Sequence, residues 1–449
     1  MCCPEIKDGV IHLAHWSRGG VHPDENKSAT RHKPVEEMPA PDQVSLPLSM
    51  HIGAVCEPLV KEGQEVRMGQ IVGDSQSPVS APIHATVSGK VIAVEPRPHP
   101  NGSQVMSVVI ENDGKDTPDE SMAPRGSVES LTPEELLRVI HGAGIVGLGG
   151  AAFPTHVKIK SGLGKIDTLI LNGSECEPYV TSDHRLMLES PEEVAGGLRV
   201  LMKIMGQTEA VIAVENDKRD ALEALRRTLP KKSSIKVVGL HTRYPQGAEK
   251  QLIRTVTGRE VPPGALPAAA GAAVFNVGTA AAIHRAVTMG IPLLRKIVTV
   301  SGSAVSNAKN LSVRIGTPFE AVFAATGGFR EQPAKVIMGG AMMGIAQHNL
   351  AAPVVKGCGA LLAFSREELT PPEQSCIRCG HCVEVCPMRL MPVYMHLYER
   401  RNDIEELEKQ RITDCIECGC CAYICPARLH LVHSFRTGKQ KLISMREKG

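Results

Sequence analysis

Two cysteine runs near the end of the chain constrain its fold more than any other feature. Both have the spacing C-x-x-C-x-x-C-x-x-x-C-P, and nine of the fourteen cysteines lie in the fifty residues that contain them. The runs consist of Cys376, Cys379, Cys382 and Cys386, then Cys415, Cys418, Cys421 and Cys425. Bacterial ferredoxins hold two 4Fe–4S clusters on such runs, and the fourth cysteine of each run binds the other cluster. We therefore predict a domain with two iron–sulfur clusters.

Crossed ligation divides the eight cysteines into two sets. The first cysteine set is Cys376, Cys379, Cys382 and Cys425, and the second cysteine set is Cys415, Cys418, Cys421 and Cys386. Zinc is the alternative, since paired CxxC motifs suit a tetrahedral ion, but a third spaced cysteine followed by Cys-Pro is not a zinc pattern. Cys420 falls outside the spacing and is expected to be a neighbour rather than a ligand. Two adjacent clusters pass single electrons, so this region should connect an electron donor to an acceptor.

Charge and hydropathy narrow the class of protein. Lys and Arg number 50 against 48 Asp and Glu, and this near-neutral balance argues against nucleic acid as a partner. The most apolar long stretch, residues 264–286, is interrupted by proline, asparagine, histidine and arginine, so no transmembrane segment is expected. The amino end lacks the apolar core of a secretory signal. These features indicate a reducing compartment, in which clustered thiols serve as metal ligands rather than disulfides.

The pattern along the chain predicts an α/β multidomain protein with four parts. Short β-like runs fill residues 1–117 and are similar to the barrel-sandwich pattern of lipoyl and biotinyl carriers. Those carriers hold their prosthetic group on a lysine between two halves, whereas residues 73–80 read GDSQSPVS, so we expect a structural barrel. Short β-like runs return at residues 296–364, which we interpret as a β-grasp-like SLBB module. Residues 366–449 form the expected double-cluster ferredoxin domain.

Residues 131–295 show the alternation of an α/β domain with a largely parallel sheet. A capping box begins at Thr132 and opens the first helix. Helical segments then alternate with apolar runs at residues 168–171, 211–214 and 237–240.

Two segments of this domain are candidate ligand-binding loops. Gly147, Gly149 and Gly150 let the backbone lie against a ligand and offer N–H groups to a phosphate, and Lys158 adds a positive charge. Residues 172–178 follow a strand, and open α/β sheets bind ligands at the carboxyl ends of their strands. The respective alternatives are a glycine-rich turn without a ligand and a polar loop that caps the next helix.

These loops and two later segments resemble, in order, the FMN- and NADH-binding subunit of respiratory complex I. The matching segments are residues 147–154 with Lys158, 172–178, 244–249 and 276–279. From about residue 17 to about residue 437, the chain is more similar still to the C-subunit family of Rnf-type ion-translocating ferredoxin:NAD oxidoreductases. The barrel, the flavin domain, the Met-Gly-Gly-Ala-Met-Met-Gly motif at residues 338–344 and the double-cluster tail come in that family's order.

The resemblance implies a site for FMN and NAD(H) that needs no acid, base or nucleophile. The phosphate side of FMN would contact Gly147, Gly149, Gly150 and Lys158. The ribityl chain and ring would contact Asn172, Ser174 and Glu175, and the pocket would be closed by Tyr244, Gly247 and Asn276. The adenine of NADH would stack on Phe153, and the acidic positions near the nicotinamide nucleotide are Glu177 and Glu249.

The same resemblance implies an enzyme subunit that transfers electrons at the cytoplasmic face of the cell membrane, as a peripheral protein without a span of its own. A flavin takes a hydride from NADH and passes electrons on singly, which suits the one-electron clusters. The implied partners are the membrane subunits of the ion-translocating complex, an iron–sulfur partner subunit, ferredoxin and NAD(H).

Three other functions fit the same modules. One is a cobalamin reductase that contains flavin and iron–sulfur clusters. Another is the NADH-oxidising subunit of a soluble hydrogenase or formate dehydrogenase, which the amino-terminal barrel disfavours. The third is a non-enzymatic iron–sulfur scaffold with a decayed flavin site, suggested by Leu148 and Ser174 at positions where complex I has arginine and aspartate.

Overall fold

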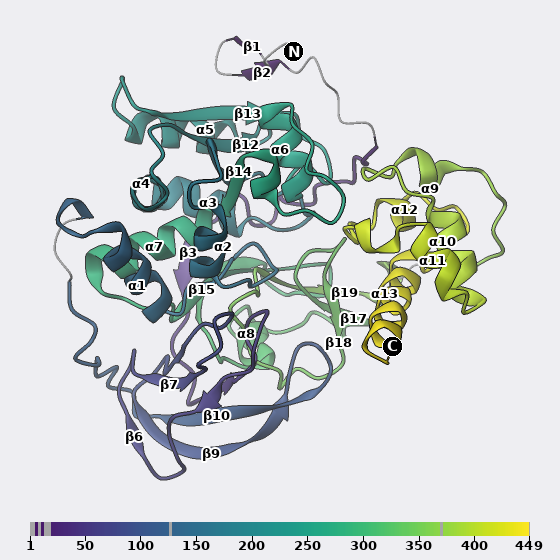
Figure 1. The fold of residues 1–449 in the computed structure, drawn as a ribbon. Coiled ribbons are helices and arrows are strands. Elements are labelled where there is room, and N and C mark those ends of the chain that lie inside the picture. The colour runs from purple at the N-terminus through teal and green to yellow at the C-terminus, as the bar shows by residue number, and fades with distance from the viewer. Residues whose placement is uncertain (1–4, 8–9, 13–18, 125–127, 369–370, 449) are drawn as a thin grey trace.

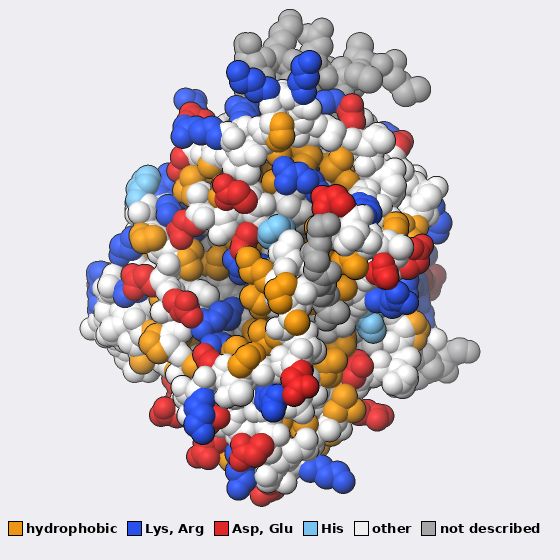
Figure 2. All heavy atoms as spheres, turned by 90° about the vertical axis from the view of Figure 1, so that its left-hand side faces the viewer, with side chains coloured by type: hydrophobic (Ala, Val, Ile, Leu, Met, Phe, Trp, Pro, Cys, Tyr) orange, Lys and Arg blue, Asp and Glu red, His pale blue; other side chains and the backbone are white. Residues whose placement is uncertain are grey.

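The computed structural model describes residues 5–7, 10–12, 19–124, 128–368 and 371–448. Figure 1 shows four parts, which are an amino-terminal β structure, an α/β layer, a β module between these two, and a lobe of short helices at the carboxyl end. This arrangement agrees with the predicted α/β multidomain class. On the face shown in Figure 2, basic and acidic side chains are interspersed.

Two small sheets form the amino-terminal β structure. One has the order β4-β10-β9-β6 and the other the order β5-β7-β8. The strands are β4 (Gln43–Pro47), β5 (Glu57–Pro58), β6 (Glu65–Val66), β7 (Ile71–Asp74), β8 (Ile83–His84), β9 (Gly89–Pro98) and β10 (Gln104–Asn112). Val44 and Leu46 are fully buried and are separated by a more exposed residue, which is the period-two pattern of a half-buried strand.

A parallel sheet in the order β13-β12-β11-β14 forms the centre of the α/β layer. Its strands are β11 (Thr168–Gly173), β12 (Ala210–Glu215), β13 (Ile235–Leu240) and β14 (Ala272–Asn276), which cover the three predicted runs and add a fourth. The helices are α1 (Pro133–Gly142), α2 (Thr155–Gly162), α3 (Ser182–Glu189), α4 (Pro191–Met205), α5 (Arg219–Thr228), α6 (Glu249–Thr257) and α7 (Val277–Met289), with short 3-10 turns η1 (Val128–Ser130) and η2 (Pro267–Ala270). Asn172 and Asn276 are register partners at the carboxyl ends of β11 and β14, so two predicted loops meet there.

The helix α1 begins with the predicted capping box. The Thr132 hydroxyl accepts a hydrogen bond from the Glu135 N–H at 3.2 Å, and the Glu135 carboxylate accepts one from the Thr132 N–H at 2.8 Å. These bonds satisfy backbone donors that have no partner within the first helical turn. At the start of α7, the Asn276 side-chain oxygen accepts a hydrogen bond from the Gly278 N–H at 2.8 Å.

The β module is a mixed sheet in the order β18-β17-β19-β15-β16-β3. Its elements are β3 (Val35–Glu37), β15 (Arg295–Ser301), β16 (Lys309–Arg314), α8 (Phe319–Ala324), β17 (Lys335–Met338), β18 (Ile345–Gln347) and β19 (Ala360–Phe364). The strand β3 pairs with β16, although it comes from the segment expected to form the barrel.

Two further strands of the amino-terminal segment, β1 (Glu5–Lys7) and β2 (Val10–His12), extend the α/β sheet beside β13. The amino-terminal segment therefore contributes to four sheets, and the expected domain limits remain predictions.

The carboxyl-terminal lobe consists of several short helices and the longer helix α13, around a core of its own. The 3-10 turn η3 (Arg366–Glu368) precedes the lobe. The helices of the lobe are α9 (His381–Glu384), α10 (Pro392–Arg400), α11 (Ile404–Lys409), η4 (Ile412–Asp414), α12 (Cys420–Tyr423) and α13 (Leu431–Lys448). Met395 and Leu407 are fully buried in this core. Lys441 holds α13 to α10 by an ion pair with Glu399 at 2.9 Å. Within the described residues, no helix combines the length and apolar character that crossing a membrane requires.

Candidate functional site

The two cysteine runs fold against each other so that the crossed sets come together. Burial raises the pKa of Cys382, and the thiols that add to this effect are those of Cys425, Cys379 and Cys376. Burial likewise raises the pKa of Cys421, whose neighbouring thiols are those of Cys418, Cys415 and Cys386. Each fourth cysteine thus lies beside the other run, which is the arrangement that crossed ligation requires. Ligation itself remains a prediction.

The two runs also share a local backbone conformation that suits cluster ligands. Arg378 and Glu417 have left-handed φ angles of 56° and 55°, and their N–H groups each lie 3.4 Å from a sulfur, that of Cys376 and that of Cys415 respectively. Hydrogen bonds of this kind stabilise negative charge on cluster sulfurs. Within the described residues, no three His, Cys, Asp or Glu side chains converge as a single metal ion requires.

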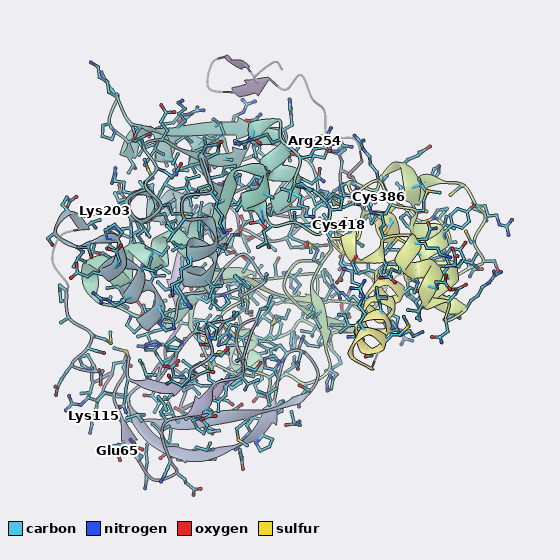
Figure 3. The ribbon with its side chains drawn as sticks, viewed as in Figure 1. Glu65, Lys115, Lys203, Arg254, Cys386 and Cys418 are labelled. Carbon is cyan, nitrogen blue, oxygen red and sulfur yellow. The ribbon has the colours of Figure 1, made fainter. Side chains whose placement is uncertain are left out.

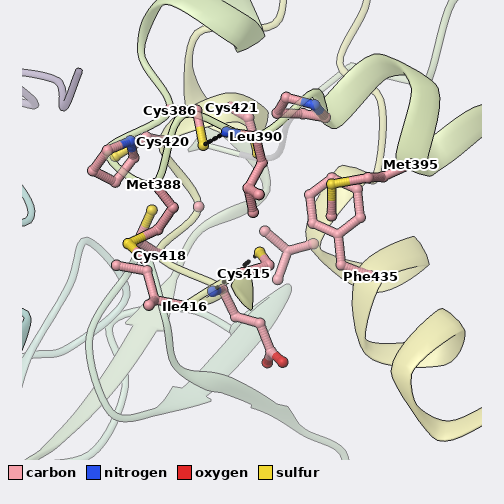
Figure 4. Close-up of a pocket in the computed structure, with 15 residues that line it drawn as sticks. Cys386, Met388, Leu390, Met395, Cys415, Ile416, Cys418, Cys420, Cys421 and Phe435 are labelled. Carbon is pink, nitrogen blue, oxygen red and sulfur yellow. Dashed lines mark hydrogen bonds between the residues drawn. The ribbon is translucent and has the colours of Figure 1, made fainter. Parts of the chain in front are cut away.

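The second cysteine set lines a buried cavity. Figure 4 shows Cys386, Cys415, Cys418 and Cys421 around it, together with the apolar side chains of Met388, Leu390, Met395, Ile416 and Phe435. Cys418 and Cys421 are each 7% exposed, whereas Cys376 and Cys379 of the first set are exposed to solvent. The two sets therefore differ in burial despite their identical spacing.

Two hydrogen bonds hold the backbone of the second cysteine set. The Lys439 ammonium donates to the Cys415 carbonyl at 2.7 Å, and the Tyr244 hydroxyl donates to the Cys418 carbonyl at 2.7 Å. Tyr244 belongs to the α/β layer, and Cys420 packs beside it in the same apolar group. Figure 3 shows Cys386 and Cys418 on the side of the lobe nearest the α/β layer. The second set therefore faces that layer.

The glycine loop, residues 147–153, forms a tight turn at the carboxyl end of the α/β sheet. The Gly147 N–H donates to the carbonyl of Phe153, a half-buried residue, at 2.8 Å, and the Ala152 N–H donates to the Gly147 carbonyl at 3.1 Å. Gly150 has a φ of +119° and Ala152 a φ of +51°. Positive φ angles of this kind occur in tight turns whose successive N–H groups can bind anions.

The tip of the glycine loop has the features of an anion-binding site. In the described part of the chain, no hydrogen bond uses the N–H groups of Gly149, Gly150 or Ala151. Successive free N–H groups in a turn are able to form a nest, a backbone concavity that binds phosphate and other anions.

Two asparagines bring the other predicted segments to this loop. Asn276 lies beside Gly149, since a Cβ added to the glycine would stand 3.5 Å from the asparagine Cβ. The Asn172 amide donates to the Gly247 carbonyl at 2.8 Å and accepts a hydrogen bond from the Ser174 N–H at 3.1 Å. The Ser174 hydroxyl is fully buried and has no partner within the described structure. An unpaired buried hydroxyl fits a site that a ligand completes.

Lys158 and Glu249 form an ion pair at the edge of this group of residues. The Lys158 ammonium lies 5.4 Å from the centre of the Phe275 ring, at the end of β14. Lys158 therefore lies near the carboxyl end of β14, and its charge is balanced by Glu249. Its contact with a phosphate, and that of Glu249 with a nicotinamide nucleotide, remain predictions.

The Glu175 carboxylate is engaged within the protein. It accepts hydrogen bonds from the N–H groups of Asp183 at 2.6 Å and His184 at 3.0 Å, at the start of α3. Burial raises the pKa of Glu175. Because both oxygens have backbone partners, its contact with a cofactor also remains a prediction.

Glu177 and Tyr244 lie between the α/β layer and the helical lobe rather than beside the glycine loop. The Glu177 carboxylate accepts hydrogen bonds from the N–H groups of Met342 at 2.9 Å and Met343 at 3.0 Å, and the Tyr244 hydroxyl lies 3.4 Å from it. Burial raises the pKa of Glu177. This pair joins the motif at residues 338–344 to the second cysteine set, a role that the sequence does not suggest.

Two lysines at these sites have no signal in the sequence. Lys439 binds the Cys415 carbonyl, and Lys296 on β15 donates to the Leu148 carbonyl in the glycine loop at 2.7 Å. Each lysine lies far along the chain from the loop that it contacts, so no spacing pattern identifies it.

The chain matches four family models. Residues 15–115 match the RnfC barrel sandwich hybrid domain, and residues 140–285 match the Nuo51 FMN-binding domain. Residues 297–346 match the SLBB domain, and residues 375–429 match the 4Fe-4S dicluster domain.

Relatives of known name cover nearly the whole chain. The C subunit of the Na⁺-translocating ferredoxin:NAD⁺ oxidoreductase complex of Acetobacterium woodii is 49% identical over 436 residues, which is 96% of this chain and 98% of that protein. The C subunit of the proton-translocating ferredoxin:NAD⁺ oxidoreductase complex of Clostridium ljungdahlii is 46% identical over 395 residues, or 88% of this chain and 86% of that protein. A solved NAD⁺-reducing nickel–iron hydrogenase in its H₂-reduced state has a TM-score of 0.49 and 18% identity, covering 72% of this chain and 64% of its own.

Proposed function

The chain belongs to the C-subunit family of ion-translocating ferredoxin:NAD⁺ oxidoreductase complexes, and we propose that it exchanges a hydride with NAD(H) at FMN and single electrons with partner subunits. It is an electron-transfer subunit with an FMN-binding domain and a 4Fe–4S dicluster domain, and its partners are the other subunits of such a complex. The observation that carries the proposal is the combination, on one chain, of a free N–H nest and a buried cysteine set that faces the same α/β layer.

The residues around the glycine loop fit a flavin phosphate. The free N–H groups of Gly149, Gly150 and Ala151 would donate to phosphate oxygens, and Asn172 and Ser174 would face the rest of the cofactor. FMN, when bound, takes two electrons as a hydride and releases them singly. The chain's own task is to bind and orient the flavin and the nicotinamide nucleotide and to exclude water, for which no acid or base is required.

The two cysteine sets supply the thiolates for two clusters, each of which holds one transferable electron. The second set faces the α/β layer at Tyr244, whereas the first set has exposed cysteines at Cys376 and Cys379. On this proposal the second set serves the flavin side, and the first set serves exchange with partner subunits.

The proposal also concerns the chain's own catalytic step and its place in the cell. Hydride exchange with NAD(H) would make this chain the nicotinamide-reactive subunit of the complex. It would lie peripherally at the cytoplasmic face of the membrane, where NAD(H) and ferredoxin are available to it. Phe153, Glu177 and Glu249 are the proposed contacts with the nicotinamide nucleotide.

Reconstitution of the purified chain with iron, sulfide and FMN tests this function. We expect about eight irons per chain and one FMN bound noncovalently. NADH should then bleach the flavin absorbance and produce the EPR signals of reduced clusters. Intact clusters without FMN uptake would leave only the iron–sulfur scaffold. Reduction of a corrinoid without NAD(H)-linked ferredoxin turnover would indicate a cobalamin reductase instead.

A further inference from the structure

Lys296 is a buried lysine that reaches from the β module into the glycine loop. It lies on β15, is 7% exposed, and donates a hydrogen bond to the Leu148 carbonyl at 2.7 Å. The module approaches the loop at a second point, since a Cβ added to Gly357 would stand 2.8 Å from the Gly150 carbonyl oxygen. The back of the loop is therefore built by a sheet from another part of the chain.

The Lys296 ammonium has more donors than partners. It carries three N–H groups, and within the described residues its one hydrogen bond is to Leu148, with no ion pair. Burial lowers the pKa of Lys296, and the nearby carboxylate of Asp183 is the strongest opposing influence. The Asp183 carboxylate offsets part of the Lys296 charge, but the ammonium keeps unused donors at the back of the glycine loop. Lys296 therefore places a cation with free donors next to the loop that would bind an anion.

The hydrogen bond to Leu148 acts on the nest through one peptide group. The Leu148 carbonyl and the Gly149 N–H belong to the same trans peptide, so they point in opposite directions. A donor that holds the carbonyl from behind therefore aims the Gly149 N–H toward the ligand side. The Leu148 N–H is fixed as well, because it donates to the Thr279 hydroxyl at 2.9 Å. A bond from a cation also polarises the peptide and strengthens its N–H as a donor.

We propose that Lys296 is a positioning residue for a phosphate bound in the glycine loop. Lys296 orients the Gly149 N–H toward the phosphate and offsets the phosphate charge. This inference rests on the proposed function in that it takes the phosphate to be that of FMN. It makes the β module part of the cofactor site, although the match to the FMN-binding domain ends at residue 285.

Flavin fluorescence titrations of the full-length, cluster-loaded chain test the role of Lys296. Riboflavin has the ring and ribityl chain of FMN but no phosphate, so the comparison isolates phosphate binding. Lys296→Met should weaken FMN binding about 10- to 100-fold, the range of a charge-assisted hydrogen bond, and change riboflavin binding less than about twofold. Lys309→Met is the matched control, because Lys309 lies in the same module but pairs with Glu36 at 2.7 Å. It should bind FMN as tightly as the wild type.

Unchanged FMN affinity in Lys296→Met would overturn the proposal. An equal loss of FMN and riboflavin binding would overturn it too, because the effect would then not concern the phosphate. If the Met variant lacks the wild-type iron content and circular dichroism, Lys296→Gln tests the charge alone, since it removes the charge and keeps a donor, and it too should weaken FMN binding more than riboflavin binding. Failure of the wild-type chain to bind FMN would instead contradict the proposed function and this inference together.

Discussion

The two cysteine runs have the same spacing and the same local backbone, but their surroundings differ. Cys376 and Cys379 of the first set are exposed to solvent. Cys418 and Cys421 of the second set are buried, Cys418 beside Tyr244 of the α/β layer and Cys421 in the core of the helical lobe, and the second set lines an apolar cavity. One sequence pattern therefore occurs in two different electrostatic environments within the same lobe.

The difference comes from what each run packs against. The second set contacts the α/β layer through Tyr244 and the last helix through Lys439, each of which donates to a cysteine carbonyl at 2.7 Å. The reduction potential of a cluster depends on its exposure, on nearby charge and on hydrogen bonds. Equal spacing should therefore not give equal potentials. Spacing determines which cysteines come together, and tertiary neighbours determine how readily each cluster accepts an electron.

Cys386→Ala should have the largest effect of these substitutions, because it should remove one of the two clusters. Cys386 belongs to the first run but to the second cysteine set, so the substitution should disrupt the buried cluster and spare the exposed one. The iron content should fall from about eight to about four per chain, with loss of one EPR signal. Cys420→Ala should keep both clusters. Retention of the buried cluster in Cys386→Ala, with loss of the exposed one, would show that each run binds its own cluster.

Treatment with an iron chelator should separate the two clusters by their exposure. The cluster of the first set should be lost in a fast phase that removes about half of the iron, because solvent reaches Cys376 and Cys379. The cluster of the second set should be lost more slowly. Iron release and EPR followed over time measure this, and a single phase for both clusters would contradict the difference in burial.

Lys439→Met should lower the reduction potential of the buried cluster. Reduction adds negative charge, which a nearby cation favours, so removal of the ammonium makes reduction harder. The shift should be on the order of 50 mV, less than the full value of a charge-assisted hydrogen bond for one electron. Lys441→Met is the control, because Lys441 pairs with Glu399 and not with a ligand carbonyl. An EPR-monitored redox titration should show no change in the reduction potential of the exposed cluster. An equal change in both potentials would contradict a specific effect of Lys439 on the buried cluster.

Tyr244→Phe should have the smallest effect. It removes a neutral hydrogen bond to the Cys418 carbonyl and keeps the ring, so the potential of the buried cluster should fall by about 20 mV. Tyr394→Phe, a change at an exposed tyrosine in α10, should leave both potentials unchanged. If only the reduction potential of the exposed cluster shifted, Tyr244 would lie beside the first cysteine set, which would contradict this account.

The sequence predicts those features whose determinants lie close together along the chain. The capping box at Thr132 depends on residues three apart, and the strand β11 depends on a single apolar run. The juxtaposition of Cys386 with the second run also follows from spacing, because the run motif implies the exchange of its fourth cysteine.

The remaining features depend on contacts between distant segments. The Glu177 carboxylate binds the N–H of Met342, which lies 165 residues away, and no spacing pattern indicates this contact. Lys296 is 148 residues from Leu148. A sequence shows that a carboxylate or an ammonium is present, but it does not show which distant backbone group will satisfy it.

Freeze-quench EPR after mixing with NADH tests most directly whether the second cysteine set is on the flavin side. Cys376→Ala should remove the exposed cluster, and Cys421→Ala should remove the buried one. With FMN bound, NADH should reduce the remaining buried cluster in Cys376→Ala as fast as in the wild type. It should reduce the remaining exposed cluster in Cys421→Ala far more slowly. Rapid reduction of the exposed cluster in Cys421→Ala, with slow reduction of the buried cluster in Cys376→Ala, would contradict this order.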